Sequence, residues 1–297
     1  MNIKPKKKYK YLYKEQIGPR KYRYFYDEKL HKAWLKKQQY IKNEPEFMKN
    51  IPKTKDITDP DAPVLMSADN SAKVNAGFWD SDTYTTNNCF FCTTAYELRQ
   101  RGYDVKAKQS EYGAMGKNAY NIYKNPKIVT FSENVENNPE ELKKQLVEKS
   151  GPGSRGNICI NLKPYGGHSM AYEISPDGND VVIVDTQTNE NFHLAYVASR
   201  IDAKPASTKT ESSMFFRTDN LELKKDILNL VQPVNSETEV VTGGEYSISD
   251  RKSVKLSSYV DKDVYKELFD EKGNPSQDPE RIYPEGYDEA KIKVTWG

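Results

Sequence analysis

Three apolar segments follow one another closely between residues 157 and 187, and they constrain the fold more than any other part of the sequence. They are NICINLKP (157–164), HSMAYEI (168–174) and DVVIVDTQ (180–187), each with the length and composition of a β-strand. The SPDGN between the last two has Pro and Gly where a tight turn uses them. We therefore expect consecutive strands, the last two joined as an antiparallel hairpin.

A segment with two cysteines, NNCFFCTTAYELRQRG, has the pattern of a helix. Asn88 suits the N-cap, and Gly102 suits the left-handed position just past a C-terminus. Phe91, Ala95 and Leu98 recur at helical spacing and predict one apolar face.

Two further segments are expected to be helical. Asn138 can cap a helix that begins with Pro139 and ends at the glycine-rich SGPGSRG. NLELKKDILNLV, residues 220–231, also has its apolar residues at helical spacing.

The ends of the chain differ from its middle. Apolar residues make up 36% of the sequence and charged residues 30%, which predicts a compact middle with polar flanks. We expect a basic tyrosine-rich docking arm at 1–43, a proline-containing linker at 44–63, a compact domain at 64–232 and a polar extension at 233–297.

The basic arm has fourteen Lys and Arg against three Asp and Glu. Tyrosines alternate with other residues on both sides of a Gly-Pro break, which predicts a β-hairpin with a tyrosine face. Asp27 can then cap a helix with Leu30, Trp34 and Leu35 on one face. Interleaved Tyr and Lys suit stacking on nucleic-acid bases or covering a neighbouring protein, and the sequence does not rank the two.

Cys89 follows the expected N-cap directly, so its thiol would lie in the field of the helix N-terminus. That position favours the thiolate, which is the nucleophilic form of cysteine. Cys89 lies off the apolar face of the helix, whereas Cys92 lies nearer to it and is expected to pack.

A thiolate nucleophile needs a base, and the base needs a group that orients it. His168 opens a strand after YGG and is the best of the three histidines for this role. If Ser175 pairs with Asp180, the register places His168 opposite Gln187 and within side-chain reach of Asp185 on the neighbouring strand. A loop one residue shorter would turn Asp185 to the other face, so Asp185 is either the orienting carboxylate or a solvated strand end.

An oxyanion formed during acyl transfer needs donors near the nucleophile. The side chain of Asn87 or Asn88, with the backbone N–H of Cys89, is expected to supply them.

Four motifs together resemble the papain-fold toxin domain, a group of cysteine hydrolases and deamidases found in bacterial polymorphic toxins and phage head-associated proteins. The motifs are NNCFFCTTAYELRQRGYDVKA, GPGSRGNICINL, GGHSMAYEI and VVIVDTQTN. The resemblance covers about residues 70–231. It implies an α+β, papain-like fold with a central helix packed on an antiparallel sheet. The tyrosine-rich start resembles segments of phage minor head proteins more loosely.

The resemblance also implies roles for individual residues. Cys89 matches the nucleophile, His168 the general base and Asp185 the orienting residue, while Gln187 matches a polar residue of the same sheet motif. The family often has Gly where this chain has Asn189, which tolerates the same left-handed turn.

The expected function is that of a thiol hydrolase acting on an amide bond of a protein, as a glutamine deamidase or a peptidase or isopeptidase, in a toxin or a phage particle. No cofactor is expected. The partners would be a protein substrate and, through the basic arm, phage capsid or portal proteins or nucleic acid.

Three alternatives stay open. Cys89, Cys92, Cys159 and His168 form an acceptable zinc ligand set, although a second Cys pair is missing and Asp185 would have no role. A redox Cys-x-x-Cys is weaker, because no βαβ pattern precedes it. The third alternative is a phage minor head or other structural interaction protein whose papain-like domain is inactive.

Location is expected to be the host cytoplasm or the virion. No apolar run approaches the length of a membrane span, and the basic N-terminus has no apolar stretch behind it that would make a signal peptide.

Overall fold

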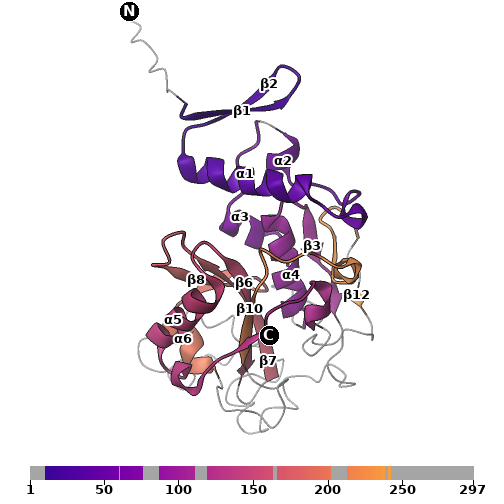
Figure 1. Cartoon of the computed structure of the whole chain (residues 1–297). Coiled ribbons are helices and arrows are strands. Elements are labelled where there is room, and N and C mark those ends of the chain that lie inside the picture. Colours follow the sequence, from indigo (N-terminus) through magenta and orange to yellow (C-terminus); the bar gives the residue numbers. More distant parts are fainter. Residues whose placement is uncertain are drawn as a thin grey trace, which may run out of the picture.

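The computed structural model describes residues 11–59, 61–75, 87–110, 119–162, 166–201, 213–237 and 240–241. It is an α+β structure built around one six-stranded sheet (Figure 1). In spatial order the strands are β5 (Val129–Thr130), β10 (Met214–Arg217), β6 (Arg155–Leu162), β7 (Gly166–Ile174), β8 (Val181–Asp185) and β9 (Glu190–Phe192). All neighbours are antiparallel.

Of the two registers that the sequence left open for the hairpin of β7 and β8, the structure has the one in which Ser175 pairs with Asp180. Tyr172 pairs with Ile183 and Ala171 with Val184, and the Ser175 N–H donates to the Asp180 carbonyl across the turn. Because side chains alternate between the two faces of a sheet, this register decides which residues at the far end of the hairpin meet.

Helices cover both faces of the sheet (Figure 1). α4 (Cys89–Gln100) packs on one face, where its apolar side chains share a core with Ala171, Val184 and Phe216. α5 (Pro139–Ser150) and α6 (Leu194–Arg200) pack on the other face, in a second core that contains Ile158 and Met170. The sheet is therefore the middle layer of three.

Helix α4 begins and ends where the sequence predicts. Asn88 is its N-cap residue, and Gly102 has a φ of +97° just beyond its end. The sequence predicts one buried apolar face, but the helix is buried on all sides, because every side chain from Cys89 to Arg99 is buried. The central helix is enclosed by the sheet on one side and by shorter elements on the other.

Helix α5 also follows the sequence signals, since the Asn138 side chain accepts from the Glu141 N–H at its start. The helix predicted at 220–231 was wrong. That segment contains a 3-10 turn, η5 (Lys225–Asn229), and then β11 (Val231–Pro233). Its apolar residues still pack, with Ile227 and Leu230 fully buried in the core around α4.

Two small sheets and two 3-10 turns lie around the main sheet and its helices. β11 pairs with β3 (Val105–Ala107), and β12 (Val240–Val241) pairs with β4 (Gln109–Ser110). The 3-10 turns η3 (Ala119–Ile122) and η4 (Glu133–Val135) precede α5.

The N-terminal hairpin and helix are both present. β1 (Tyr13–Gly18) and β2 (Lys21–Phe25) pair antiparallel, and α1 (Glu28–Lys42) is capped by Asp27. The predicted tyrosine face is only partly correct. Tyr22 and Tyr24 share one face of the hairpin, whereas Tyr13, which pairs with Phe25, lies on the other.

The apolar face predicted for α1 is only partly correct. Its buried residues are His31, Trp34 and Lys37, whereas Leu35 is 40% exposed. His31 and Lys37 can be buried because each has a carboxylate partner outside α1. His31 pairs with Glu15, and Lys37 pairs with Asp56.

The sequence favours residues 44–63 as a linker, but those that the structure describes, 44–59 and 61–63, include short helices and buried side chains. They include η1 (Glu46–Met48) and α2 (Lys55–Thr58), and α3 (Ser67–Ser71) follows them. Met48 lies in the core around α4, and Thr54 and Asp56 are fully buried. Most of the predicted extension at 233–297 lies outside the described residues, as do the flanks of β12.

Within the described part of the chain, none of the helices has the length and apolar character that crossing a membrane requires.

Candidate active site

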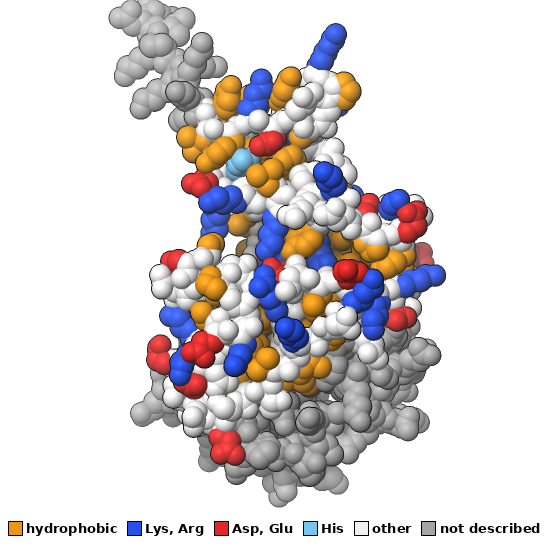
Figure 2. Space-filling view, in the orientation of Figure 1, with side chains coloured by type: hydrophobic (Ala, Val, Ile, Leu, Met, Phe, Trp, Pro, Cys, Tyr) orange, Lys and Arg blue, Asp and Glu red, His pale blue; other side chains and the backbone are white. Residues whose placement is uncertain are grey.

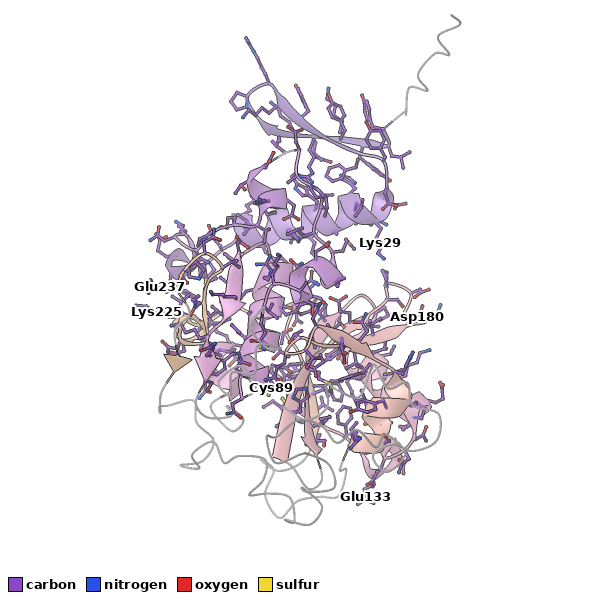
Figure 3. All side chains as sticks on the ribbon, turned by 180° about the vertical axis from the view of Figure 1, so that it is seen from behind. Lys29, Cys89, Glu133, Asp180, Lys225 and Glu237 are labelled. Atoms are coloured by element: carbon purple, nitrogen blue, oxygen red, sulfur yellow. The ribbon has the colours of Figure 1, made fainter. Side chains whose placement is uncertain are left out.

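Cys89 occupies the first position of α4 and is 7% exposed. The N–H groups of a helix's first turn have no carbonyl partner within the helix, so they give this end a partial positive charge. Figure 3 shows Cys89 in the lower half of the view, far from the hairpin β1–β2. Cys89 is thus a buried residue at the positive end of α4.

His168 and Asp185 lie in contact at the end of the β7–β8 hairpin. The imidazole Nε2 is 2.7 Å from Oδ2 of Asp185, a carboxylate that is almost fully buried. The other carboxylate oxygen accepts from the backbone N–H of Gln187 at 3.0 Å. Each oxygen therefore has a donor, and the orientation of the ring is held by the carboxylate.

Cys89 is the second partner of the His168 ring. Burial by itself would lower the pKa of His168, but the Asp185 carboxylate and the hydrogen bond and charge of Cys89 raise that pKa well above its ordinary value. Since Asp185 binds Nε2, the nitrogen that can serve Cys89 is Nδ1. The structure thus brings the predicted residues Cys89, His168 and Asp185 together from three different elements.

The raised pKa of His168 has a direct chemical consequence. A histidine that holds its proton near neutral pH can stabilise an adjacent thiolate as an ion pair. The same proton is then available for a leaving group. The arrangement can therefore activate a nucleophile and supply an acid from one ring.

Asn88 is placed differently from its predicted role as an oxyanion donor. Its amide nitrogen donates to the Asn75 side chain at 3.2 Å and to the Lys108 carbonyl at 3.1 Å. Its amide oxygen accepts from Gln187 Nε2 at 3.1 Å. Both N–H groups of the Asn88 amide are thus engaged, so the residue positions the start of α4 instead.

Gln187 links the two halves of the site. Its backbone N–H binds Asp185, and its side chain binds Asn88 beside the nucleophile. Asn75, which sequence reasoning missed, donates to the Gln187 carbonyl at 3.0 Å. No local pattern marks Asn75, because its role depends on contacts with distant segments. Asn87 directly precedes these groups, at the entry to α4.

The two other cysteines are buried as well. Burial, with the charge of Cys89 nearby, raises the pKa of Cys92 well above its ordinary value and that of Cys159 to about 12. Both thiols therefore stay protonated at neutral pH, and the described cysteines are all free. The zinc alternative needs a group of at least three His, Cys, Asp or Glu side chains arranged around a metal ion. Among the described residues there is no such group.

Comparisons of the chain with family models, with curated proteins and with solved structures gave no match.

Proposed function

We propose that this chain is a papain-like thiol hydrolase that attacks an amide bond of a protein, as a glutamine deamidase or as a peptidase or isopeptidase. The observation that carries the proposal is the grouping of a helix-N-terminal cysteine, a histidine and a buried carboxylate. Nucleophile, base and orienting group in this order are the signature of covalent thiol catalysis.

The proposed reaction begins with the Cys89 proton on His168. The thiolate attacks the amide carbonyl carbon, and the resulting oxyanion is stabilised by N–H groups at the start of α4. The C–N bond then breaks as His168 protonates the leaving ammonia or amine, and a thioester remains. Water, deprotonated by His168, attacks the thioester and releases an acid and the free thiol.

Asp185 has a supporting role in this scheme. It holds the ring through Nε2 and stabilises the imidazolium, so it never needs to take the proton itself. The geometry of the site supports attack on a carbonyl carbon. The products then identify the reaction: conversion of an amide to an acid indicates deamidation, and a cut chain indicates proteolysis.

Iodoacetamide labelling at a series of pH values tests the proposal. Cys89→Ala is expected to abolish the labelling seen near pH ~6 and all hydrolysis, because an activated thiolate reacts well below the ordinary cysteine range. His168→Ala should shift labelling to higher pH, and Asp185→Ala should have a smaller effect. Cys92→Ser is the matched control, since it removes a thiol from the same helix and should keep the low-pH labelling.

The alternative function is a phage minor head or other structural interaction protein with an inactive papain-like domain, binding capsid or portal proteins. The exposed aromatic hairpin favours interaction of some kind. If no cysteine of the native protein labels below about pH 8, the hydrolase proposal fails and the structural function is preferred.

A further inference from the structure

The hairpin β1–β2 exposes a cluster of aromatic rings on the side that faces away from α1. Tyr24 pairs with Lys14 and Tyr22 with Gln16, so these four residues share one face. The ring of Tyr11 lies 4.8 Å from that of Tyr24. These tyrosines are 40–44% exposed, and Tyr26, next along the chain, is 60% exposed.

The opposite face of the hairpin packs against the rest of the protein. Arg23 and Phe25 are buried there, and the Phe25 ring packs against Trp34 of α1. Since this inner face anchors the hairpin, the outer tyrosines are not needed to hold it in place. We name the outer set, Tyr11, Lys14, Tyr22, Tyr24 and Tyr26, the tyrosine surface.

The charge of the tyrosine surface is positive. The Lys14 ammonium lies 4.0 Å from the centroid of the Tyr22 ring and 5.7 Å from that of Tyr24. Glu15 is the one carboxylate between residues 11 and 26, and its side chain binds His31 on the inner side. The ten residues that precede the hairpin in sequence contain five lysines and no acid.

We infer that the tyrosine surface binds single-stranded nucleic acid. Unpaired bases stack on aromatic rings whatever their sequence, and nearby lysines neutralise the phosphates. The tyrosine surface offers four rings and one lysine without a carboxylate, and a lysine-rich segment precedes it in sequence, so it fits both the bases and the phosphates of such a strand. An acidic protein would use the lysines, but it would have little need for four exposed tyrosines in and beside one hairpin.

The tyrosine surface lies at one end of the molecule, away from the candidate active site. In Figure 2 apolar and basic side chains gather on the hairpin at the top of the view, and in Figure 3 Cys89 lies in the lower half. Because the two sites are far apart, the inference about this surface does not depend on the proposed thiol chemistry.

Fluorescence anisotropy of a labelled oligo(dT) with the full chain tests the inference. Binding should weaken as salt increases, because counterions are released when phosphates are neutralised. Tyr24→Ala should weaken binding by at least about 5-fold, since it removes one stacking ring. Tyr24→Phe keeps the ring and should bind like the original chain. Lys14→Gln should reduce the slope of log affinity against log salt by about 0.7.

Leu35→Ala, at an exposed apolar position on α1 outside the tyrosine surface, is the matched control and should not change binding. Thermal unfolding of every variant shows whether a loss of binding reflects a loss of folding. The inference is overturned if Tyr24→Ala binds oligo(dT) as well as the original chain. It is also overturned if polyglutamate binds the original chain and Tyr24→Ala with an affinity similar to that of oligo(dT). That result would mark a surface for acidic proteins.

Discussion

His168 should make the stability of this protein depend on pH in a defined direction. Its pKa is raised in the folded protein, against the effect of burial, by Asp185 and Cys89. The folded state therefore binds the proton more tightly than the unfolded chain does. The resulting stabilisation is complete below the ordinary histidine pKa of about 6.5, and it is lost as pH rises through the raised folded value.

The advantage of the original chain over His168→Gln in free energy of unfolding should thus shrink as pH rises above about 6.5. Denaturant unfolding at several pH values measures it. In an Asp185→Asn background the same comparison should depend much less on pH. A difference that stays constant across this range would show that His168 is not held protonated by its neighbours.

Asn88 ties the start of the nucleophile's helix to Lys108 and to Gln187, which follows β8. Asn88→Ala removes one hydrogen bond from the Lys108 carbonyl and one from the Gln187 amide in a buried site, so we expect a loss of about 1 to 3 kcal/mol in unfolding free energy. Because the start of α4 loses its support, the rate of Cys89 alkylation should also fall.

Asn138→Ala is the matched control, since Asn138 caps α5 on the other face of the sheet. It should cost about 1 kcal/mol and leave Cys89 alkylation unchanged. Equal effects of the two variants on alkylation would contradict a positioning role for Asn88.

At the scale of the elements, close packing across the sheet depends on Gly156 in β6. A Cβ at this position would lie 2.3 Å from both the Phe216 carbonyl oxygen and the Tyr172 hydroxyl. Gly156→Ala should therefore destabilise the protein by about 3 kcal/mol, because neither the backbone of β10 nor the buried ring can move aside.

Gly18→Ala provides the comparison, because the nearest atom to its added Cβ is 3.9 Å away. Its unfolding free energy should change by less than about 0.5 kcal/mol. Chemical denaturation measures the unfolding free energy of both variants. Similar values would mean that the strands around Gly156 can move apart without destabilising the protein.

Elements whose signals are local could be predicted from the sequence. The turn at 175–180 and the strands on either side of it were predicted, but two registers stayed open. The register in the structure brings His168 into contact with Asp185. The segment 220–231 was misassigned because its apolar spacing fits a helix, whereas in the fold Leu223 bridges to Tyr123 and the chain then joins β3. Here the tertiary environment overrides helical propensity.

Contacts between distant segments left no local signal. The burial of Lys37 depends on Asp56, nineteen residues away, and Asn75 reaches Asn88 and Gln187 from outside every predicted motif. The predicted boundaries at residues 43 and 63 followed charge and proline content, which do not report such pairs.

At the scale of the whole molecule, α1 joins the N-terminal segment to the sheet. The Tyr40 hydroxyl donates to the Asp219 carbonyl at 2.7 Å, and Lys36 pairs with the side chain of the same residue. Beside it, Glu97 of α4 binds Arg101 and Arg155. Arg155 of β6 also donates to the Tyr40 hydroxyl at 3.5 Å. These polar contacts connect α1, α4 and β6, so removing residues 1–60 should destabilise the rest of the fold.

The Lys37–Asp56 pair allows this connection to be tested with a single substitution. Lys37 Nζ lies 2.7 Å from Asp56 Oδ2, and the two side chains are 3% and 0% exposed. Lys37→Ala would leave a buried carboxylate without its cation, which typically costs about 3 to 5 kcal/mol. Lys32 on the same helix makes an exposed pair with Glu28, so Lys32→Ala should produce no measurable change. Thermal and urea unfolding of the full chain distinguish the two, with Cys89 labelling as a second readout. If both lysine variants unfold like the original chain, residues 1–43 are a separate arm, as their charge alone suggested, and α1 contributes nothing to the fold that carries the site.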